Sequence, residues 1–204
     1  MNKMIKNAAI LTVITLIAGL GLGAVYEITK DPIAKANEKA KQKAYEQVIA
    51  EADNFKEYAD FDIAEAEAVL KEAGITGNTV DEVAVALKGS ETIGYVITGT
   101  TSEGYGGEIK MSTGILRDGT VTGIAFLSIA ETAGLGMNAT KPEFYEQFSG
   151  KQVEQFEVVK GGAGAEDEID ALSGATITSS AVTGDVNAAL TYFNGILEGG
   201  STDE

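Results

Sequence analysis

The chemically most suggestive stretch of the sequence is residues 170–176, Asp-Ala-Leu-Ser-Gly-Ala-Thr, which precedes the last segment with helical periodicity. It fits the pattern D-x-x-[S/T]-G-A-[T/S]. Gly174 and Ala175 remove bulk beside the hydroxyl of Thr176, which leaves that hydroxyl accessible. A threonine hydroxyl is a weak nucleophile unless a base lies next to it. The alternative interpretation is an ordinary strand-to-helix turn with a threonine cap.

Three residue types are missing from the chain, and their absence excludes several kinds of site. The sequence contains no Cys, no His and no Trp. Iron–sulfur clusters, c-type haem attachment and ordinary zinc sites need Cys or His ligands, and catalysis by Ser-His-Asp or Cys-His needs the same residues. Any redox chemistry must then come from an organic cofactor. The acidic segment of residues 166–170 could bind a hard cation such as Ca²⁺, but it lacks the ligand spacing of an EF-hand and is interpreted as a solvated loop. We expect no metal site and no catalytic residues.

The charge of the chain argues against nucleic-acid binding. Acidic residues number 31 and basic residues 15, which gives a formal net charge of −16. Such a surface repels phosphate backbones.

Two glycine-containing segments lie upstream of residues 170–176. One is "GYGGEIKMSTGI", residues 104–115, and the other is "SIAETAGLG", residues 128–136. Each segment alone is typical of a hairpin connection. Their occurrence together with the Thr176 motif favours a shared role.

The three segments together resemble the covalent FMN-binding domain of the Rnf and Na⁺-translocating NADH:quinone reductase complexes, over about residues 94–196. In that family a flavin transferase joins FMN through its phosphate to the last Thr of the motif, which is Thr176 here. The length and the single amino-terminal apolar segment look more like the G subunit of the Rnf electron transport complex than the C subunit of the reductase. The latter remains the alternative.

The resemblance also implies which other residues lie near the flavin. Asp170 is interpreted as a recognition or positioning residue. The family usually has E-T-P-G-L-G where this chain has Ala133, and the glycines of that loop allow the backbone to approach a flat ring. The remaining expected cofactor-binding residues are Ser173, Gly174, Ala175, Thr178, Glu131, Thr132, Gly134, Leu135, Gly136, Tyr105 and Gly106.

A phosphate on Thr176 would lie close to the start of the last helix, predicted over residues 179–197. We expect the amides of Ile177, Thr178 and Ser179 to point at the phosphate, since a helix amino terminus favours negative charge. The base for the attachment would have to come mostly from the transferase. Glu131, if close, would disfavour the anionic reduced flavin and lower its potential.

The amino-terminal segment is predicted to anchor the chain in a membrane. Residues 7–26 carry no charge and would span roughly 30 Å as a helix. A cleaved signal peptide is the alternative, but its apolar core is usually about 7 to 15 residues long. The count of flanking lysines does not favour export, although the very short charged tail is typical of a signal anchor.

The fold class is predicted to be α+β, a mainly antiparallel sheet flanked by helices. After the transmembrane anchor, residues 1–26, we expect a membrane-proximal helical segment, residues 27–75, an FMN-binding domain, residues 76–197, and a disordered tail, residues 198–204. Helices are expected over residues 33–52, begun by Asp31-Pro32, and over 62–74, 140–151 and 179–197. Strands are expected over residues 79–87, 91–101, 105–119, 120–132 and 152–162, with a hairpin turn at residues 117–119.

The functional expectation is an electron-transfer subunit of a membrane-bound ion-translocating ferredoxin:NAD⁺ oxidoreductase, with covalent FMN and no substrate chemistry of its own. Its partners would be the other membrane subunits and a flavin transferase. It would lie in the inner membrane with a single span and the folded domain outside the cytoplasm. A rival hypothesis is an anchored FMN reductase module that delivers electrons to an external acceptor.

Overall fold

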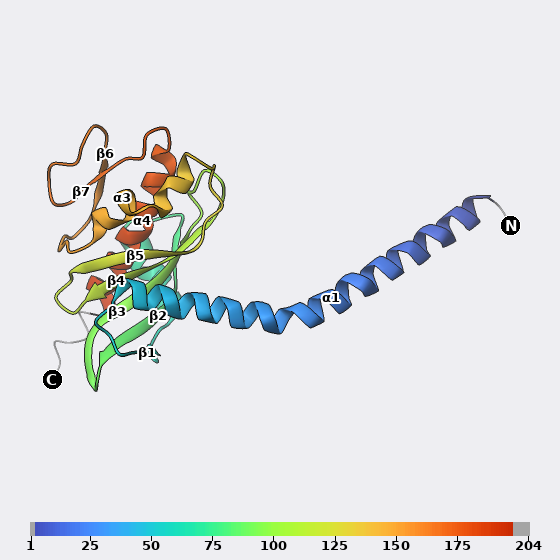
Figure 1. Cartoon of the computed structure of the whole chain (residues 1–204), viewed down its shortest axis with the longest axis horizontal. Helices are drawn as coiled ribbons and strands as arrows, with labels where there is room; N and C mark the ends of the chain where they lie inside the picture. The colour runs from blue at the N-terminus through green and yellow to red at the C-terminus, as the bar shows by residue number, and fades with distance from the viewer. Residues whose placement is uncertain (1–2, 198–204) are drawn as a thin grey trace. The chain divides into compact units, whose positions relative to one another are not determined.

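The computed structural model of the chain describes residues 3–197, which form two units (Figure 1). The first unit ends at Lys41 and the second, compact unit begins at Gln42. The predicted tail, residues 198–204, lies outside the described residues. Strand β1 (Asn54–Glu57) and helix α2 (Ile63–Glu72), from the segment expected to be membrane-proximal, contribute to the compact unit.

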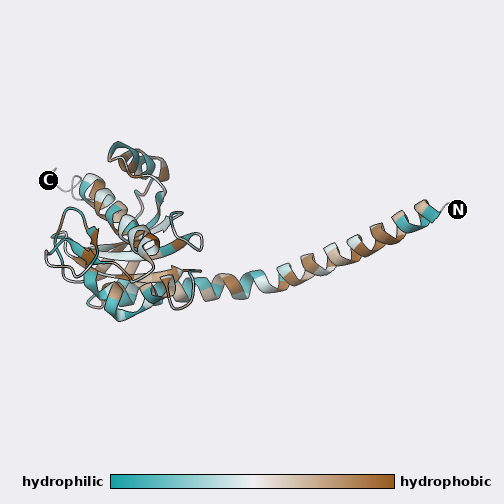
Figure 2. Ribbon diagram, turned by 90° about the horizontal axis from the view of Figure 1, so that it is seen from above, coloured by the Kyte–Doolittle hydropathy of each residue, from teal (hydrophilic) through white to brown (hydrophobic). Residues whose placement is uncertain are grey.

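The amino-terminal helix α1 runs from Lys3 to Val48 without a break. It contains one segment long and apolar enough to cross a membrane, and Figure 2 shows hydrophobic residues predominating in the half nearer the N-terminus. The separate helix predicted to begin at Asp31-Pro32 was wrong, because Pro32 lies inside α1. The surrounding Ala-, Lys- and Glu-rich sequence favours helix, so the hydrogen bond that proline removes is lost without ending the helix.

The core of the compact unit is a five-stranded antiparallel sheet in which each strand pairs with the next. Strand β1 pairs with β2 (Asn78–Lys88), followed by β3 (Glu91–Thr101), β4 (Ile109–Leu116) and β5 (Val121–Ser128). The predicted turn at residues 117–119 is confirmed: Gly119 has φ 85°, and the amide of Gly119 donates to the carbonyl of Leu116. The α+β class with a mainly antiparallel sheet is confirmed.

Two layers of apolar side chains cover the sheet. Tyr45 and Val48 at the end of α1, and Ile49 directly after it, belong to a cluster with Ala84 and Val96. Helix α4 (Thr176–Tyr192) packs against β2, β3 and β4 within the larger cluster. It is buried on nearly all sides, which is typical of a central helix.

Helix α2 begins and ends as the sequence predicts. Asp62 caps it, with its carboxylate accepting from the amide of Ala64 at 2.7 Å. The chain leaves the helix through Gly74, whose φ of 74° suits glycine.

Three predicted elements differ from the structure. Residues 140–151 form no single helix; a 3₁₀ turn η1 (Gly136–Thr140), helix α3 (Pro142–Tyr145) and a second 3₁₀ turn η2 (Glu146–Phe148) replace it. The strand expected over residues 152–162 shortens to β6 (Glu157–Val159), which pairs in parallel with β7 (Glu168–Asp170). The last helix starts at Thr176, and its last turn, η3 (Phe193–Leu197), is π-helical.

Candidate functional site

A cavity of about 500 Å³ lies where the amino terminus of α4 meets the loop after β5 and the loop between β3 and β4. These are the three segments that the sequence singled out. Nine of its ten lining residues were expected from the sequence: Tyr105, Glu131, Thr132, Leu135, Gly136, Gly174, Ala175, Thr176 and Thr178. The fold therefore brings together most of the expected site.

Four expected residues do not line the cavity: Asp170, Ser173, Gly106 and Gly134. Gly106 instead lies where two loops touch, since a Cβ added there would be 2.3 Å from the carbonyl oxygen of Ala130. Gly134 has φ 77°, a conformation that few other residues adopt. Both glycines shape the loops that form the cavity wall.

Asp170 lies at the end of β7 and is held by Gln147. The side-chain amide of Gln147 donates to the carbonyl of Asp170 at 3.3 Å, and its oxygen accepts the amide of Asp170 at 2.7 Å. The carboxylate of Asp170 accepts from the amide of Gly162. These contacts fix the chain shortly before the turn that leads to Thr176, while the Asp170 side chain stays out of the cavity wall.

Glu131 is the most unusual polar group of the cavity. Its side chain lines the cavity, the residue is only 8% exposed, and both carboxylate oxygens are buried without a hydrogen-bond partner among residues 3–197. Oε1 lies 3.0 Å from where a Cβ of Gly104 would be, and Oε2 lies 2.6 Å from where a Cβ of Gly136 would be. A buried carboxylate without partners is costly, so this arrangement suits a ligand that brings hydrogen-bond donors.

Helix α4 presents its first turn to the same cavity. Ala175 is the N-cap residue and Thr176 the first helical residue, so the amides of Thr176, Ile177 and Thr178 have no acceptor within the helix. The expectation for Ser179 was wrong, because its amide already donates to the carbonyl of Ala175 at 3.0 Å. The earlier helix start moves the set of free amides back by one residue.

The turn before Thr176 explains the Ser-Gly-Ala part of the motif. The amide of Ala175 donates to the carbonyl of Leu172 at 3.0 Å, which closes a four-residue turn. Its third residue, Gly174, has φ 74°, the conformation that type II turns require at that position. The turn therefore needs glycine there, as well as offering access to the hydroxyl.

The mouth of the cavity is apolar and exposed. Tyr105, Leu135 and Ile177 are 71%, 43% and 55% exposed and all line the cavity. The sequence analysis used Ile177 only for its amide and missed its side chain, because the family motif ends at Thr176 and an isoleucine in a helix is usually a core residue. Flat aromatic ligands are held by such surfaces.

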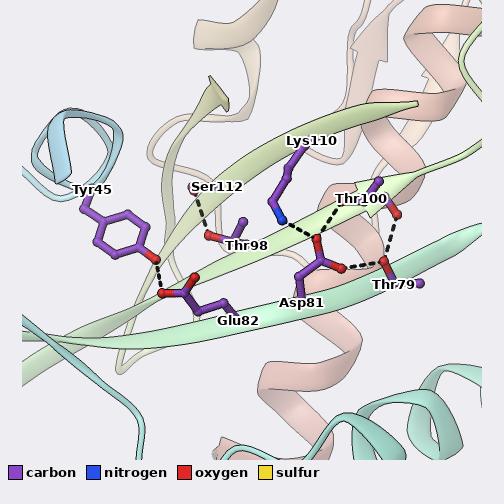
Figure 3. Close-up of polar contacts among 8 residues, drawn as sticks. All are labelled: Tyr45, Thr79, Asp81, Glu82, Thr98, Thr100, Lys110 and Ser112. Atoms are coloured by element: carbon purple, nitrogen blue, oxygen red, sulfur yellow. Dashed lines mark hydrogen bonds and ion pairs between the residues drawn. The ribbon is translucent and has the colours of Figure 1, made fainter. Parts of the chain in front are cut away.

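A second polar cluster lies apart from the cavity, on the face of the sheet opposite to α4 (Figure 3). Asp81, at a β-bulge in β2, accepts from the hydroxyls of Thr79 and Thr100 at 2.8 and 2.6 Å and pairs with Lys110 at 2.7 Å. Burial by itself would raise the pKa of Asp81, but the hydrogen bond from Lys110, the two hydroxyls and the lysine charge lower it overall.

Asp185 of α4 is a buried acid that the charges of this cluster influence. It is 2% exposed, and its Oδ1 has no hydrogen-bond partner within residues 3–197. Burial, helped by the charge of Asp81 and opposed by that of Lys110, raises the pKa of Asp185 well above its usual value. Asp185 lies nine positions after Thr176 in α4, roughly 13 Å along the axis, so the cluster is distinct from the cavity.

Two family sequence models match the chain. One, described as FMN-binding domain, matches residues 104–191, which include all three cavity segments. The other, described as RnfG N-terminal region, matches residues 1–48.

Curated relatives match nearly the whole chain. The G subunit of the Na(+)-translocating ferredoxin:NAD(+) oxidoreductase complex of Acetobacterium woodii is 35% identical over 198 residues, 94% of this chain and 92% of the relative. The G subunit of the proton-translocating ferredoxin:NAD(+) oxidoreductase complex of Clostridium ljungdahlii is 33% identical over 93% of this chain and 91% of the relative.

A solved structure shares the fold. The crystal structure of the C subunit of the Na(+)-translocating NADH-quinone reductase of Parabacteroides distasonis superposes with a TM-score of 0.51 at 23% identity, over 80% of this chain and 83% of that chain. Together with the motif order, the sequence matches above show that the chain belongs to the family of G subunits of ion-translocating ferredoxin:NAD(+) oxidoreductase complexes, with an FMN-binding domain at residues 104–191.

Proposed function

We propose that the chain is the electron-transfer subunit of a membrane-bound ion-translocating ferredoxin:NAD⁺ oxidoreductase and carries FMN joined through its phosphate to the hydroxyl of Thr176. The observation that carries this proposal is the position of Thr176 at the first residue of α4, in the wall of the same cavity as the unpartnered Glu131 carboxylate. The complex in this proposal is the one named for the relatives, which are G subunits of ferredoxin:NAD(+) oxidoreductase complexes. When bound, FMN supplies reversible transfer of one or two electrons.

The residues of the cavity fit the parts of FMN. The amides of Thr176, Ile177 and Thr178 and the positive end of the helix dipole favour a phosphate at this place. The exposed side chains of Tyr105 and Leu135 offer apolar surface to a ring system. The two unpaired oxygens of Glu131 can accept from donor groups of the cofactor, such as a ring N–H or a ribityl hydroxyl.

Attachment needs a maturation enzyme in this proposal. Thr176 is half-buried and therefore reachable, but a threonine hydroxyl is a weak nucleophile without a base, and the chain has no histidine or cysteine to activate it. A flavin transferase would supply the base. Its recognition would include Asp170 and Ser173, which the structure places outside the cavity wall, on the segment leading to Thr176.

The single apolar segment of α1 supports a membrane anchor in this proposal. We place the compact unit outside the cytoplasm, where free FMN is scarce and a dissociated cofactor would be lost by mass action. Covalent attachment removes that loss. The other membrane subunits of the complex would be its electron donor and acceptor.

The test is a denaturing gel of the full chain coexpressed with a flavin transferase and viewed under ultraviolet light. The wild type and Thr176→Ser, which keeps the hydroxyl, are expected to give a fluorescent band, and Thr176→Ala is expected to give none. A fluorescent Thr176→Ala band would place the attachment elsewhere. A dark wild type would defeat covalent FMN altogether.

A further inference from the structure

We propose that Ser179 is a positioning residue for flavin attachment: its hydroxyl ties the first turn of α4 to the preceding turn and so fixes Thr176. The inference rests on the proposed function. The Ser179 hydroxyl donates to the carbonyl of Ala175 at 3.0 Å and accepts from the amide of Leu172 at 2.9 Å. Leu172 and Ala175 are the first and last residues of the turn that delivers the chain to Thr176.

The contacts of Ser179 act on the peptide that Thr176 shares with Ala175. The carbonyl of Ala175 receives two hydrogen bonds from Ser179, one from its amide and one from its hydroxyl, both at 3.0 Å. In a trans peptide the N–H points away from the C=O. Holding the carbonyl of Ala175 along the helix therefore aims the amide of Thr176 outward from the helix end, where the phosphate is proposed to lie.

The other end of the turn depends on the same hydroxyl. The amide of Leu172, a half-buried residue, has Ser179 Oγ as its acceptor, and the amide of Ala175 closes the turn on the carbonyl of Leu172. Without the Ser179 hydroxyl the turn keeps two hydrogen bonds, from the Ala175 amide to the carbonyl of Leu172 and from the Ser179 amide to the carbonyl of Ala175. The residue pair Gly174–Ala175, which has little side chain of its own to pack, would then sample other conformations.

The position of the Thr176 hydroxyl matters for the attachment step, because the new bond forms at its oxygen, Oγ1. Oγ1 of Thr176 forms a bond to the flavin-bearing phosphorus of a flavin dinucleotide, the phosphoanhydride bond breaks, and a nucleoside monophosphate leaves. The hydroxyl proton passes to the base of the transferase, and no oxidation or reduction occurs. Small displacements of a reacting atom slow such transfers strongly.

The experiment measures the rate of covalent flavin transfer to the full chain, purified in detergent without flavin, with a flavin transferase and FAD. Labelling is followed by intact mass, and the unfolding midpoint of each variant is measured in parallel. Ser179→Ala is expected to be labelled about tenfold more slowly than the wild type. Ser180→Ala, the same change at the exposed neighbouring serine, is expected to keep the wild-type rate.

Two further variants separate positioning from simple stabilisation. Val186→Ala removes buried volume from α4 ten residues beyond Thr176 and is expected to lower the unfolding midpoint while keeping the labelling rate. Ser179→Cys keeps the size of the side chain but forms weaker hydrogen bonds, and it is expected to be slow even if Ser179→Ala does not fold.

The outcomes are distinguishable. Wild-type rates in Ser179→Ala or Ser179→Cys would overturn the role of Ser179, and so would an equal slowing in Val186→Ala at a similar loss of midpoint. No labelling of the wild type would count against attachment at Thr176 and hence against the proposed function itself. Slow labelling in both Ser179 variants, with wild-type labelling rates in Ser180→Ala and Val186→Ala, supports the inference.

Discussion

The Cα atom of Gly136 lies against the carboxylate of Glu131, so that a Cβ atom added to Gly136 would be 2.6 Å from Glu131 Oε2. The same Cβ would also be 2.6 Å from the hydroxyl oxygen of Thr178. The last glycine of the Glu-Thr-Ala-Gly-Leu-Gly segment is therefore required for space, because it admits a buried acid and the first turn of α4 into one wall of the cavity.

Gly136→Ala is expected to push the Glu131 side chain out of its place and to lower the free energy of unfolding by about 1–3 kcal/mol. It should also reduce flavin labelling in the gel. Denaturant unfolding checks the first effect. The matched control is Gly164→Ala, since the nearest atom to a Cβ there would be 3.8 Å away. Equal stability of the two variants would contradict the steric argument.

Glu131→Gln is expected to raise the reduction potential of the flavin. The substitution keeps the shape of the side chain and removes a negative charge next to the proposed ring site, which favours the anionic reduced form by about 1–2 kcal/mol. A spectroelectrochemical titration of the flavin-loaded chain checks this. Glu154→Gln, at an exposed position, serves as the charge control; a potential that moves equally in both variants, or in neither, would sink the assignment.

Much of the fold and of the site could be predicted from the sequence, because short-range residue preferences and motifs determine those parts. The turn at residues 117–119 needed a glycine with positive φ, and Gly119 supplies it. Segments rich in Val, Ile and Thr predicted the strands. Most of the cavity residues came from motif segments, whose glycines and hydroxyls leave a recognisable pattern even far apart along the chain.

The rest depended on contacts that no local pattern records. Pro32 was expected to start a helix, but the flanking helix-favouring residues carry α1 through it. Ser179 was assigned a phosphate-facing amide, whereas its amide and hydroxyl both bond to Ala175. Whether an amide at a helix start is free depends on the residue at which the helix begins, and such boundaries are poorly specified by sequence.

A single introduced cysteine can test the proposed membrane orientation, because the chain has no cysteine of its own. Glu154→Cys lies at an exposed position of the compact unit and is expected to react with a membrane-impermeant maleimide in intact cells or spheroplasts. Lys3→Cys, before the apolar segment, should react only after lysis. The reverse pattern would place the compact unit in the cytoplasm and contradict the proposed orientation.

Asp185→Asn is expected to stabilise the protein increasingly as the pH rises above about 4. Burial, together with the Asp81 charge, raises the pKa of Asp185 in the folded state. A group whose pKa is higher in the folded state contributes stability when the pH is below its pKa in the unfolded state. That contribution is lost as the pH rises toward its pKa in the folded state. The difference in unfolding free energy between Asp185→Asn and the wild type should grow by up to about 1.4 kcal/mol per pH unit in that window.

Asp81→Asn, in strand β2, provides the opposite case. Because the folded pKa of Asp81 is lowered, its contribution is present above the unfolded pKa and is lost as the pH falls through the folded pKa. Asp81→Asn should therefore destabilise the protein at neutral pH, by about 1 kcal/mol since Asp81 is only partly buried, and the loss should shrink in acid. Urea unfolding of the wild type and of both variants between about pH 3 and pH 8 gives, for each variant, the slope with pH of its difference in unfolding free energy from the wild type. Slopes of the same sign would mean that Asp185 is not held in its neutral form by its burial between α4 and the sheet.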